Sequence, residues 1–235
     1  MSNDSSKSQA RSFLDGWVAR AAAVEDRTPE LWLSERDRRL GSVIRRVEAA
    51  AGPCRFRPSN ASSHFDALAR SIVYQQLSKK AAATIYARYL GVLGNASEPD
   101  RVLAASIETL RSAGLSCSKA RYLKELALAV SSRRLDLERI SAFADEEVVN
   151  VLTQVPGIGV WTAQMFLMFR LQRLDVLPLH DAGIQRGLQL AHRLEEPAAP
   201  TYVARAGKKW EPYRSIASLY LWAALDVQKP TSTGE

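Results

Sequence analysis

The sequence predicts an all-α protein, and three observations support this prediction. Apolar residues recur at the i, i+3, i+4 and i+7 spacing of an amphipathic helix along nearly the whole chain. No segment of strand length alternates apolar and polar residues. With 235 residues, of which 46% are hydrophobic, the chain can bury a substantial core in one domain or in two closely packed lobes.

The first expected helix is opened by Ser34-Glu-Arg-Asp37, which we interpret as a capping box. Its apolar face consists of Leu40, Val43, Ile44 and Val47. Residues 53–63 are rich in Pro, Asn and Ser and are expected to form a loop. The helix after this loop carries Phe65, Leu68 and Ile72 on one face.

Two further helices are expected in the middle of the chain, each with a serine at its start. The first has Ser78 as its N-cap, and its apolar positions are Ala82, Ile85, Tyr86 and Tyr89. The second is expected to be capped near Ser118, and its apolar positions are Tyr122, Leu123, Leu126 and Val130.

Four helices are expected in the C-terminal half, over residues 145–153, 160–171, about 182–194 and about 212–225. Residues 175–179 should run extended, because the residue before Pro178 is restricted to extended backbone. Pro156-Gly-Ile-Gly159, between the first two helices, is too short and too rich in glycine for anything but a tight turn.

This turn predicts contact with DNA. Its two glycines allow positive φ angles and the close approach of another backbone. The helix that follows begins with N–H groups that have no partner within the helix, and such groups form an anion site. We therefore interpret the segment as a helix-hairpin-helix that grips a DNA phosphate without reading the base sequence.

The hairpin and the following Pro178-Leu-His-Asp181 resemble the helix-hairpin-helix (HhH-GPD) superfamily of DNA glycosylases. Within it, they are similar to the alkylation-repair branch, the 3-methyladenine DNA glycosylases of bacteria and yeast. Three further segments carry the resemblance, which spans roughly residues 60–225: Ser71–Ser78, Leu110–Lys119 and Trp210–Trp222.

The resemblance implies two helical lobes with a cleft between them and the hairpin at the lobe boundary. It implies one HhH-GPD DNA glycosylase domain over residues 11–228, with tails at 1–10 and 229–235 that are expected to be disordered. The expected enzyme is a monofunctional, monomeric glycosylase of the 3-methyladenine glycosylase II type, acting in base excision repair. It would remove 3-methyladenine and 7-methylguanine from double-stranded DNA by base flipping and N-glycosidic hydrolysis, without an organic cofactor.

Asp181 is the candidate catalytic residue. Cleavage of an N-glycosidic bond makes the sugar oxocarbenium-like, and a carboxylate stabilises that charge or orients the attacking water. Asp181 equally suits the N-cap of the next helix, and both roles are compatible. His180 stands where the best-known relatives carry a second acid; it is interpreted as a loop histidine or as a group that contacts a phosphate or alters the basicity of Asp181.

Trp161 decides the expected mechanism. The bifunctional members of the superfamily carry a nucleophilic lysine at this position, and an indole cannot replace it. Trp161 and Trp222 are implied walls of the base pocket, with Met165 and Tyr74, although packing in the core is the alternative for such aromatic residues. Aromatic faces would favour cationic methylated purines.

Gln76 is the candidate wedge that fills the space left by the flipped base, because it has the length and hydrogen-bonding capacity for that role; an ordinary interhelical turn is the alternative. The candidate phosphate contacts are Gly157, Ile158, Gly159 and Thr162. The resemblance also implies a monovalent cation on the backbone carbonyls of Thr153, Val155 and Ile158. Lys119 and Arg214 are candidates for phosphate contact or for a structural role.

Composition narrows the class of protein. The net charge of +7 suits a polyanionic partner, and no stretch approaches the ~20 apolar residues of a membrane span. Two cysteines are too few for a disulfide framework or for the four-cysteine iron–sulfur cluster of some superfamily members. A cytoplasmic, nucleoid-associated bacterial enzyme is expected, or a nuclear one in a eukaryote.

Two other functions stay open. One is a helix-hairpin-helix protein that binds DNA without catalysis and needs neither Asp181 nor an aromatic pocket. The other is a glycosylase for a different base, such as hypoxanthine or ethenoadenine.

Overall fold

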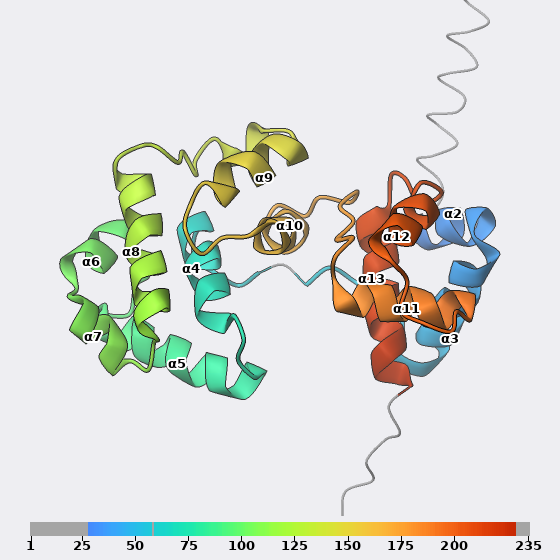
Figure 1. Ribbon diagram of the computed structural model, residues 1–235, viewed down its shortest axis with the longest axis horizontal. Coiled ribbons are helices and arrows are strands. Elements are labelled where there is room, and N and C mark those ends of the chain that lie inside the picture. Colours follow the sequence, from blue (N-terminus) through green and yellow to red (C-terminus); the bar gives the residue numbers. More distant parts are fainter. Residues whose placement is uncertain (1–27, 58, 229–235) are drawn as a thin grey trace, which may run out of the picture. The chain divides into compact units, whose positions relative to one another are not determined.

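The computed structural model describes residues 28–57 and 59–228, which form two compact units (Figure 1). Residues 28–54 and 185–228 make up the terminal unit, and residues 55–57 and 59–184 make up the central unit. Every regular element in these residues is helical, so the predicted all-α fold with two lobes is confirmed. The predicted tails at 1–10 and 229–235 lie outside the described residues.

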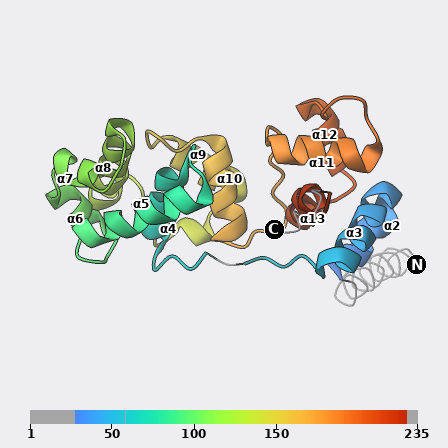
Figure 2. The same ribbon diagram turned by 90° about the horizontal axis from the view of Figure 1, so that it is seen from below.

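The terminal unit joins both ends of the described chain. Its helices are α2 (Pro29–Arg36), α3 (Arg38–Ala51), α12 (Pro200–Gly207), α13 (Arg214–Val227) and most of α11 (Ala182–His192). Helix α3 packs against α2 and α13, so segments far apart in sequence share one core (Figure 2). The apolar face predicted for α3 is confirmed, since Leu40, Val43, Ile44 and Val47 are all buried.

The capping box predicted at Ser34 is wrong. Ser34 lies inside α2, a helix that starts at Pro29 with Thr28 as its N-cap. Asp37 itself caps α3, and its Oδ1 accepts the N–H groups of Arg39 and Leu40 at 3.1 Å each. The physical reason is that an aspartate caps a helix as well as a serine does, and α2 leaves no room for an earlier start.

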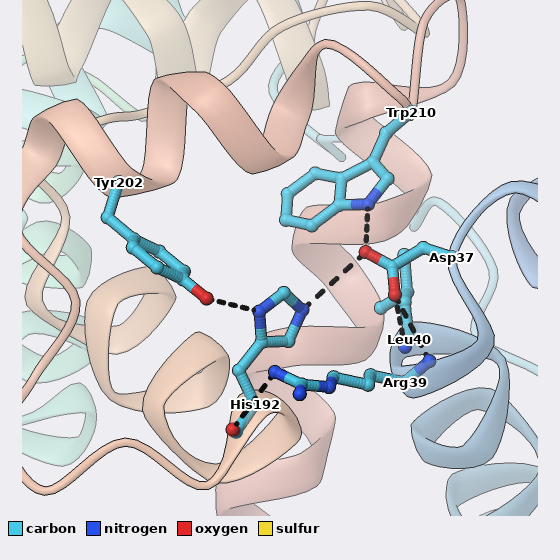
Figure 3. A network of polar contacts seen from close by, with 6 residues as sticks. All are labelled: Asp37, Arg39, Leu40, His192, Tyr202 and Trp210. Carbon is cyan, nitrogen blue, oxygen red and sulfur yellow. Dashed lines mark hydrogen bonds and ion pairs between the residues drawn. The ribbon is translucent and has the colours of Figure 1, made fainter.

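A buried polar network surrounds Asp37 (Figure 3). The indole Nε1 of Trp210, a fully buried side chain, donates to Asp37 Oδ2 at 3.1 Å. His192 Nε2 lies 3.5 Å from the same oxygen, and His192 Nδ1 lies 2.8 Å from the hydroxyl of Tyr202. Arg39 donates to the carbonyl of His192 at 3.3 Å. The network therefore ties α3 to α11 and α12.

The central unit carries the hairpin. Its helices are α4 (His64–Tyr74), α5 (Lys79–Val92), α6 (Pro99–Ala104), α7 (Ile107–Ser112), α8 (Cys117–Ser131), the 3-10 helix Ile140–Ala142, α9 (Asp145–Thr153) and α10 (Val160–Phe169). Helix α8 packs against α4, α6 and α7, and α9 packs against α10. The hairpin thus lies entirely within this unit.

The two predicted serine caps have different outcomes. Ser78 caps α5 as predicted, and its Oγ accepts the N–H of Ala81 at 3.3 Å. The cap predicted near Ser118 is wrong by two residues, because Ser116 Oγ accepts the N–H of Lys119 at 3.2 Å. Ser118 therefore lies in the first turn of α8.

Candidate functional site: a hairpin beside a lined cavity

The hairpin turn needs glycine at one of its two glycine positions. Gly157 has φ +91°, and a Cβ there would lie 2.3 Å from the ring of Tyr122 on α8. Gly159 is the N-cap of α10 with φ −92°, and a Cβ there would meet open space. Of the two glycines that the sequence allows to adopt a positive φ, only Gly157 does so, since the backbone of Gly159 is one that any residue adopts.

The hairpin N–H groups are not equivalent as phosphate donors. The N–H of Ile158 donates to the carbonyl of Val155 at 3.0 Å, and the Ile158 side chain is buried. Neither the backbone N–H nor the side chain of Ile158 therefore supports the phosphate contact predicted for this residue. In the part of the chain that the structure describes, no side chain caps α10. For the first turn of α10 after Gly159, ending at the buried Thr162, the phosphate contact stays a prediction.

Asp181 occupies the N-terminus of α11, as one of its two interpretations requires. Its Oδ1 accepts the N–H of Ile184 at 2.8 Å, and its own N–H donates to the carbonyl of Pro178 at 3.1 Å. Its other oxygen, Oδ2, accepts the indole Nε1–H of Trp161 at 2.7 Å. Asp181 therefore caps a helix and contacts the residue predicted to line the base pocket.

Trp161 is 50% exposed, so packing in the core does not account for it. It lies in the first turn of α10, immediately after the hairpin. Its indole N–H points at Asp181, and its ring lines a cavity of about 630 Å³. The side chain thus connects the hairpin, the carboxylate and the cavity.

That cavity gathers most of the predicted base-pocket and wedge residues. They come from α4, the turn after it and α10, and they are Tyr74, Gln76, Trp161 and Met165. Gly159 and Thr162 of the hairpin also line it. Trp222 lies half-buried on α13 in the terminal unit, and its predicted place in the pocket stays a prediction.

Two arginines that the sequence analysis missed line the same cavity. The guanidinium of Arg70 lies 5.0 Å from the ring centre of Tyr74 and 5.5 Å from that of Tyr86, and it donates to Asn60. Arg170 donates to the carbonyl of Ala61 at 3.0 Å. Both belong to helical patterns whose apolar positions were read as core, and no motif marks them.

The orientation of Arg170 depends on a neutral histidine. Its Nε donates to Nδ1 of His64 at 2.9 Å. Burial, and then the positive charge of Arg170, lower the pKa of His64 from its ordinary value of 6.5, so the imidazole accepts this hydrogen bond at neutral pH. One guanidinium is therefore fixed at the cavity wall.

Gln76 is an exposed turn residue whose backbone dihedral angles are uncommon for a residue other than glycine. Its φ is +56°, in the left-handed region, and it follows directly after the end of α4 at Gln75. Its neighbour Leu77 is 38% exposed and is a further exposed side chain at this turn. The sequence analysis named Gln76 and did not name Leu77. His180 is exposed, as the loop interpretation of that residue predicts.

Comparison with known proteins identifies the superfamily to which this chain belongs. The model of the HhH-GPD superfamily of base excision DNA repair proteins matches residues 69–212. The chain therefore belongs to the HhH-GPD superfamily.

Three relatives refine this assignment. The crystal structure of DNA-3-methyladenine glycosidase from Bacillus halodurans is 37% identical, with a TM-score of 0.74 over 84% of this chain and 88% of that one. The Schizosaccharomyces pombe 3-methyladenine DNA glycosylase Mag1, solved in complex with abasic DNA, is 32% identical, with a TM-score of 0.71 over 83% and 94%. The Bacillus subtilis protein YfjP is 30% identical over 171 residues, which are 70% of this chain and 60% of that relative's length. The predicted resemblance to the alkylation-repair branch is confirmed.

Among the described residues, no group of three or more His, Cys, Asp or Glu side chains is placed to hold a metal ion. No helix in the described ranges is long and apolar enough to cross a membrane.

Proposed function

We propose that this protein is a DNA glycosylase that removes alkylated purines, 3-methyladenine and 7-methylguanine, from double-stranded DNA during base excision repair. One observation carries the proposal: the Asp181 carboxylate is hydrogen-bonded to Trp161, which lies in the first turn of the second hairpin helix and lines a cavity large enough for a purine. The names of the similar glycosylases support the substrate class.

The chemistry assigned to Asp181 follows from the hydrogen bonds that its carboxylate accepts from Ile184 and Trp161. The backbone N–H of Ile184 donates to one carboxylate oxygen and the indole N–H of Trp161 donates to the other, so the two donors fix the plane of the carboxylate. A fixed negative charge beside the sugar stabilises the oxocarbenium-like transition state without reorganisation during the reaction. Methylation at N3 or N7 makes the base a better leaving group, so one carboxylate and a water suffice.

We propose that the enzyme is monofunctional and leaves an intact abasic site. In this chain, Trp161 stands at the position where bifunctional relatives carry their lysine nucleophile. Lys119 is a lysine elsewhere in the central unit, and its ammonium donates hydrogen bonds to the carbonyls of Val73 and Gln75, at 2.9 and 2.7 Å. Water is then the nucleophile that attacks the sugar C1′ as the bond to the base breaks. The products are the released base and the abasic strand.

A second substrate class is favoured by the two arginines. Guanidinium groups at the wall of a base cavity repel a cationic base and donate hydrogen bonds to the O6 and N7 acceptors of a neutral purine such as hypoxanthine. Arg70 already covers the rings of Tyr74 and Tyr86, which reduces the aromatic surface available to a cation. Hypoxanthine is therefore the alternative lesion. A DNA-binding module without catalysis would need neither this cavity nor Asp181.

The proposal includes no organic cofactor and a monomeric enzyme that works where the DNA lies, in the nucleoid or the nucleus. A monovalent cation at the hairpin belongs to the same proposal. Carbonyl oxygens suit such an ion, and that of Val155 keeps a lone pair after it accepts the N–H of Ile158. Thr153 and Ile158 would supply the other carbonyls.

Single-turnover excision from duplexes that each contain one lesion tests the proposal. The panel contains 3-methyladenine, 7-methylguanine, hypoxanthine and ethenoadenine. Faster release of the two methylated purines supports the first proposal, and faster release of hypoxanthine supports the alternative. If wild-type protein binds these duplexes and releases no base from any of them, the enzymatic function is wrong.

A further inference from the structure

Helix α8 contacts the turn that carries Gln76. The ammonium of Lys119, in the first turn of α8, donates to the carbonyls of Val73 and Gln75 at 2.9 and 2.7 Å. These carbonyls belong to the end of α4, where a helix has no backbone partners for them. Lys119 therefore caps α4 from a neighbouring helix and fixes the residue directly before Gln76.

The same turn is joined to the hairpin. Gln75 Nε2 donates to the carbonyl of Gly157 at 2.9 Å, across 82 positions of sequence. Tyr122, one turn after Lys119 on α8, fills the space against Gly157 that a Cβ would need. Lys119 and Gln75 thus form a chain of contacts that runs from α8 through the Gln76 turn to the hairpin.

Gln76 needs such support. Its φ of +56° is in the left-handed region, which a residue other than glycine adopts at a cost. An exposed residue in this conformation keeps a fixed orientation only where hydrogen bonds fix its neighbours. The neighbour Gln75 is fixed at its carbonyl by Lys119 and at its side chain by the carbonyl of Gly157.

A direct phosphate contact is the other role open to Lys119. It lines a polar cavity with Gln76 and Gly159, and its ammonium retains one N–H beyond the two hydrogen bonds described. Burial lowers its pKa from the ordinary value, and the side chain is half-buried. The two carbonyl bonds fix the ammonium inside the protein, which favours positioning over DNA contact.

We propose that Lys119 and Gln75 are positioning residues that hold Gln76 at a fixed distance from the hairpin and thereby promote extrusion of the damaged base, not cleavage of its glycosidic bond. This inference rests on the proposed glycosylase function for its kinetic test, and base extrusion can be measured without excision.

The chain offers a matched control. Lys124, five residues further on α8, donates to the carbonyl of Leu103 at 2.7 Å near the end of α6, and it lines neither cavity described. Lys119→Met and Lys124→Met therefore remove the same kind of bond from the same helix. Each keeps the apolar stem and removes the charge.

Each variant is tested on one lesion in two duplexes, paired normally and mismatched, since extrusion of a mismatched base costs less. We expect Lys119→Met to slow single-turnover excision about tenfold on the paired lesion, a loss on the scale of one charged hydrogen bond, and less than twofold on the mismatched one. Lys124→Met should change both by less than twofold. Lys119→Arg, which keeps the donors, should restore most of the rate.

Equal losses for Lys119→Met on both duplexes would overturn the inference. A uniform loss of DNA affinity with a shallower salt dependence would assign Lys119 to a phosphate instead. If Lys119→Met does not fold, Gln75→Met replaces it, because it breaks only the bond to Gly157 and should show the same paired-lesion loss.

Fluorescence separates this inference from the proposed function. A 2-aminopurine placed beside the lesion brightens when the neighbouring base leaves the stack. Wild type and Lys124→Met should raise the fluorescence on binding, and Lys119→Met should raise it less at saturating protein. This result stands even if no base is released, whereas an equal rise for all three proteins contradicts the positioning role.

Discussion

The indole N–H of Trp161 donates a 2.7 Å hydrogen bond to the carboxylate of Asp181, twenty residues further along the chain. The sequence supplied separate reasons for each residue, one as a pocket wall and one as a catalytic carboxylate. Their contact adds a reason for tryptophan at this position. It is the aromatic side chain that combines a flat face with a ring N–H donor, apart from the smaller histidine.

Trp161→Phe should lower the single-turnover excision rate while DNA affinity stays near that of wild type. Phenylalanine keeps an aromatic wall and removes the donor, so Asp181 Oδ2 loses the bond that fixes its orientation. A hydrogen bond to a charged group contributes about 1.5–3 kcal/mol, which corresponds to roughly a tenfold to hundredfold slower rate. An unchanged rate would show that the bond does not orient the carboxylate in the bound complex.

Asp181→Asn should reduce excision by about 10²-fold or more, as is typical for the loss of a transition-state charge. The asparagine oxygen can still cap α11 through the N–H of Ile184, so the helix remains. Its NH₂ group then faces the indole N–H of Trp161 and cannot accept it.

Thermal unfolding and binding to an abasic-site duplex serve as controls for Asp181→Asn. Both should stay close to wild type. Near-normal excision by this folded variant would remove Asp181 from the catalytic role.

The reaction should release base and leave the strand intact. Borohydride present during turnover should trap no covalent adduct, because Trp161 occupies the nucleophile position and cannot form a Schiff base. The measurement is a denaturing gel of the protein–DNA mixture, with a bifunctional glycosylase as positive control. A trapped adduct would require another amine and would contradict monofunctional hydrolysis.

The two hairpin glycines should respond differently to substitution. Gly159→Val should fold normally, since its φ is ordinary and the space beside it is open, yet bind an abasic-site duplex about tenfold more weakly because the side chain blocks the phosphate. Gly157→Ala should lower the free energy of unfolding by about 1–3 kcal/mol through strain and the clash with Tyr122. Tight binding by a folded Gly159→Val protein would exclude the hairpin as DNA anchor.

The terminal unit should lose stability in acid through Asp37. Burial raises its pKa, but the close contact with His192 and the hydrogen bonds from Leu40 and Trp210 outweigh burial, and the pKa lies well below its ordinary value of 3.8. Because the unfolded chain then takes up the proton first as pH falls, this stabilisation is complete above about pH 5 and is lost progressively as the pH falls below about 4 toward the lowered pKa of the folded protein.

Urea unfolding at pH 7 and pH 3, followed by tryptophan fluorescence, measures the effect. Asp37→Asn should be less stable than wild type by about 1–3 kcal/mol at pH 7, since its NH₂ group faces donors, and the difference should shrink at pH 3. A difference that is equal at both pH values would contradict the ionised role of Asp37.

The sequence by itself determined what depends on local pattern. The apolar period predicted the long helices, such as α3 and α8, because a helical face repeats within a few turns of the chain. The glycines and the short spacing predicted the hairpin, whose first helix lies at residues 145–153 as expected. The short helices α2, α6, α7 and α12 were missed because six to eight residues span too few turns to show a period.

Only the tertiary structure decided which distant residues meet. The contacts between Trp161 and Asp181, between Lys119 and the end of α4, and of Arg70 with the tyrosine rings join side chains on separate elements. Hydrogen-bonding capacity is readable from residue type, but the choice of partner depends on how helices pack. For the same reason, the sequence marked Gly157 and Gly159 as alike, and packing against Tyr122 made only Gly157 obligatory.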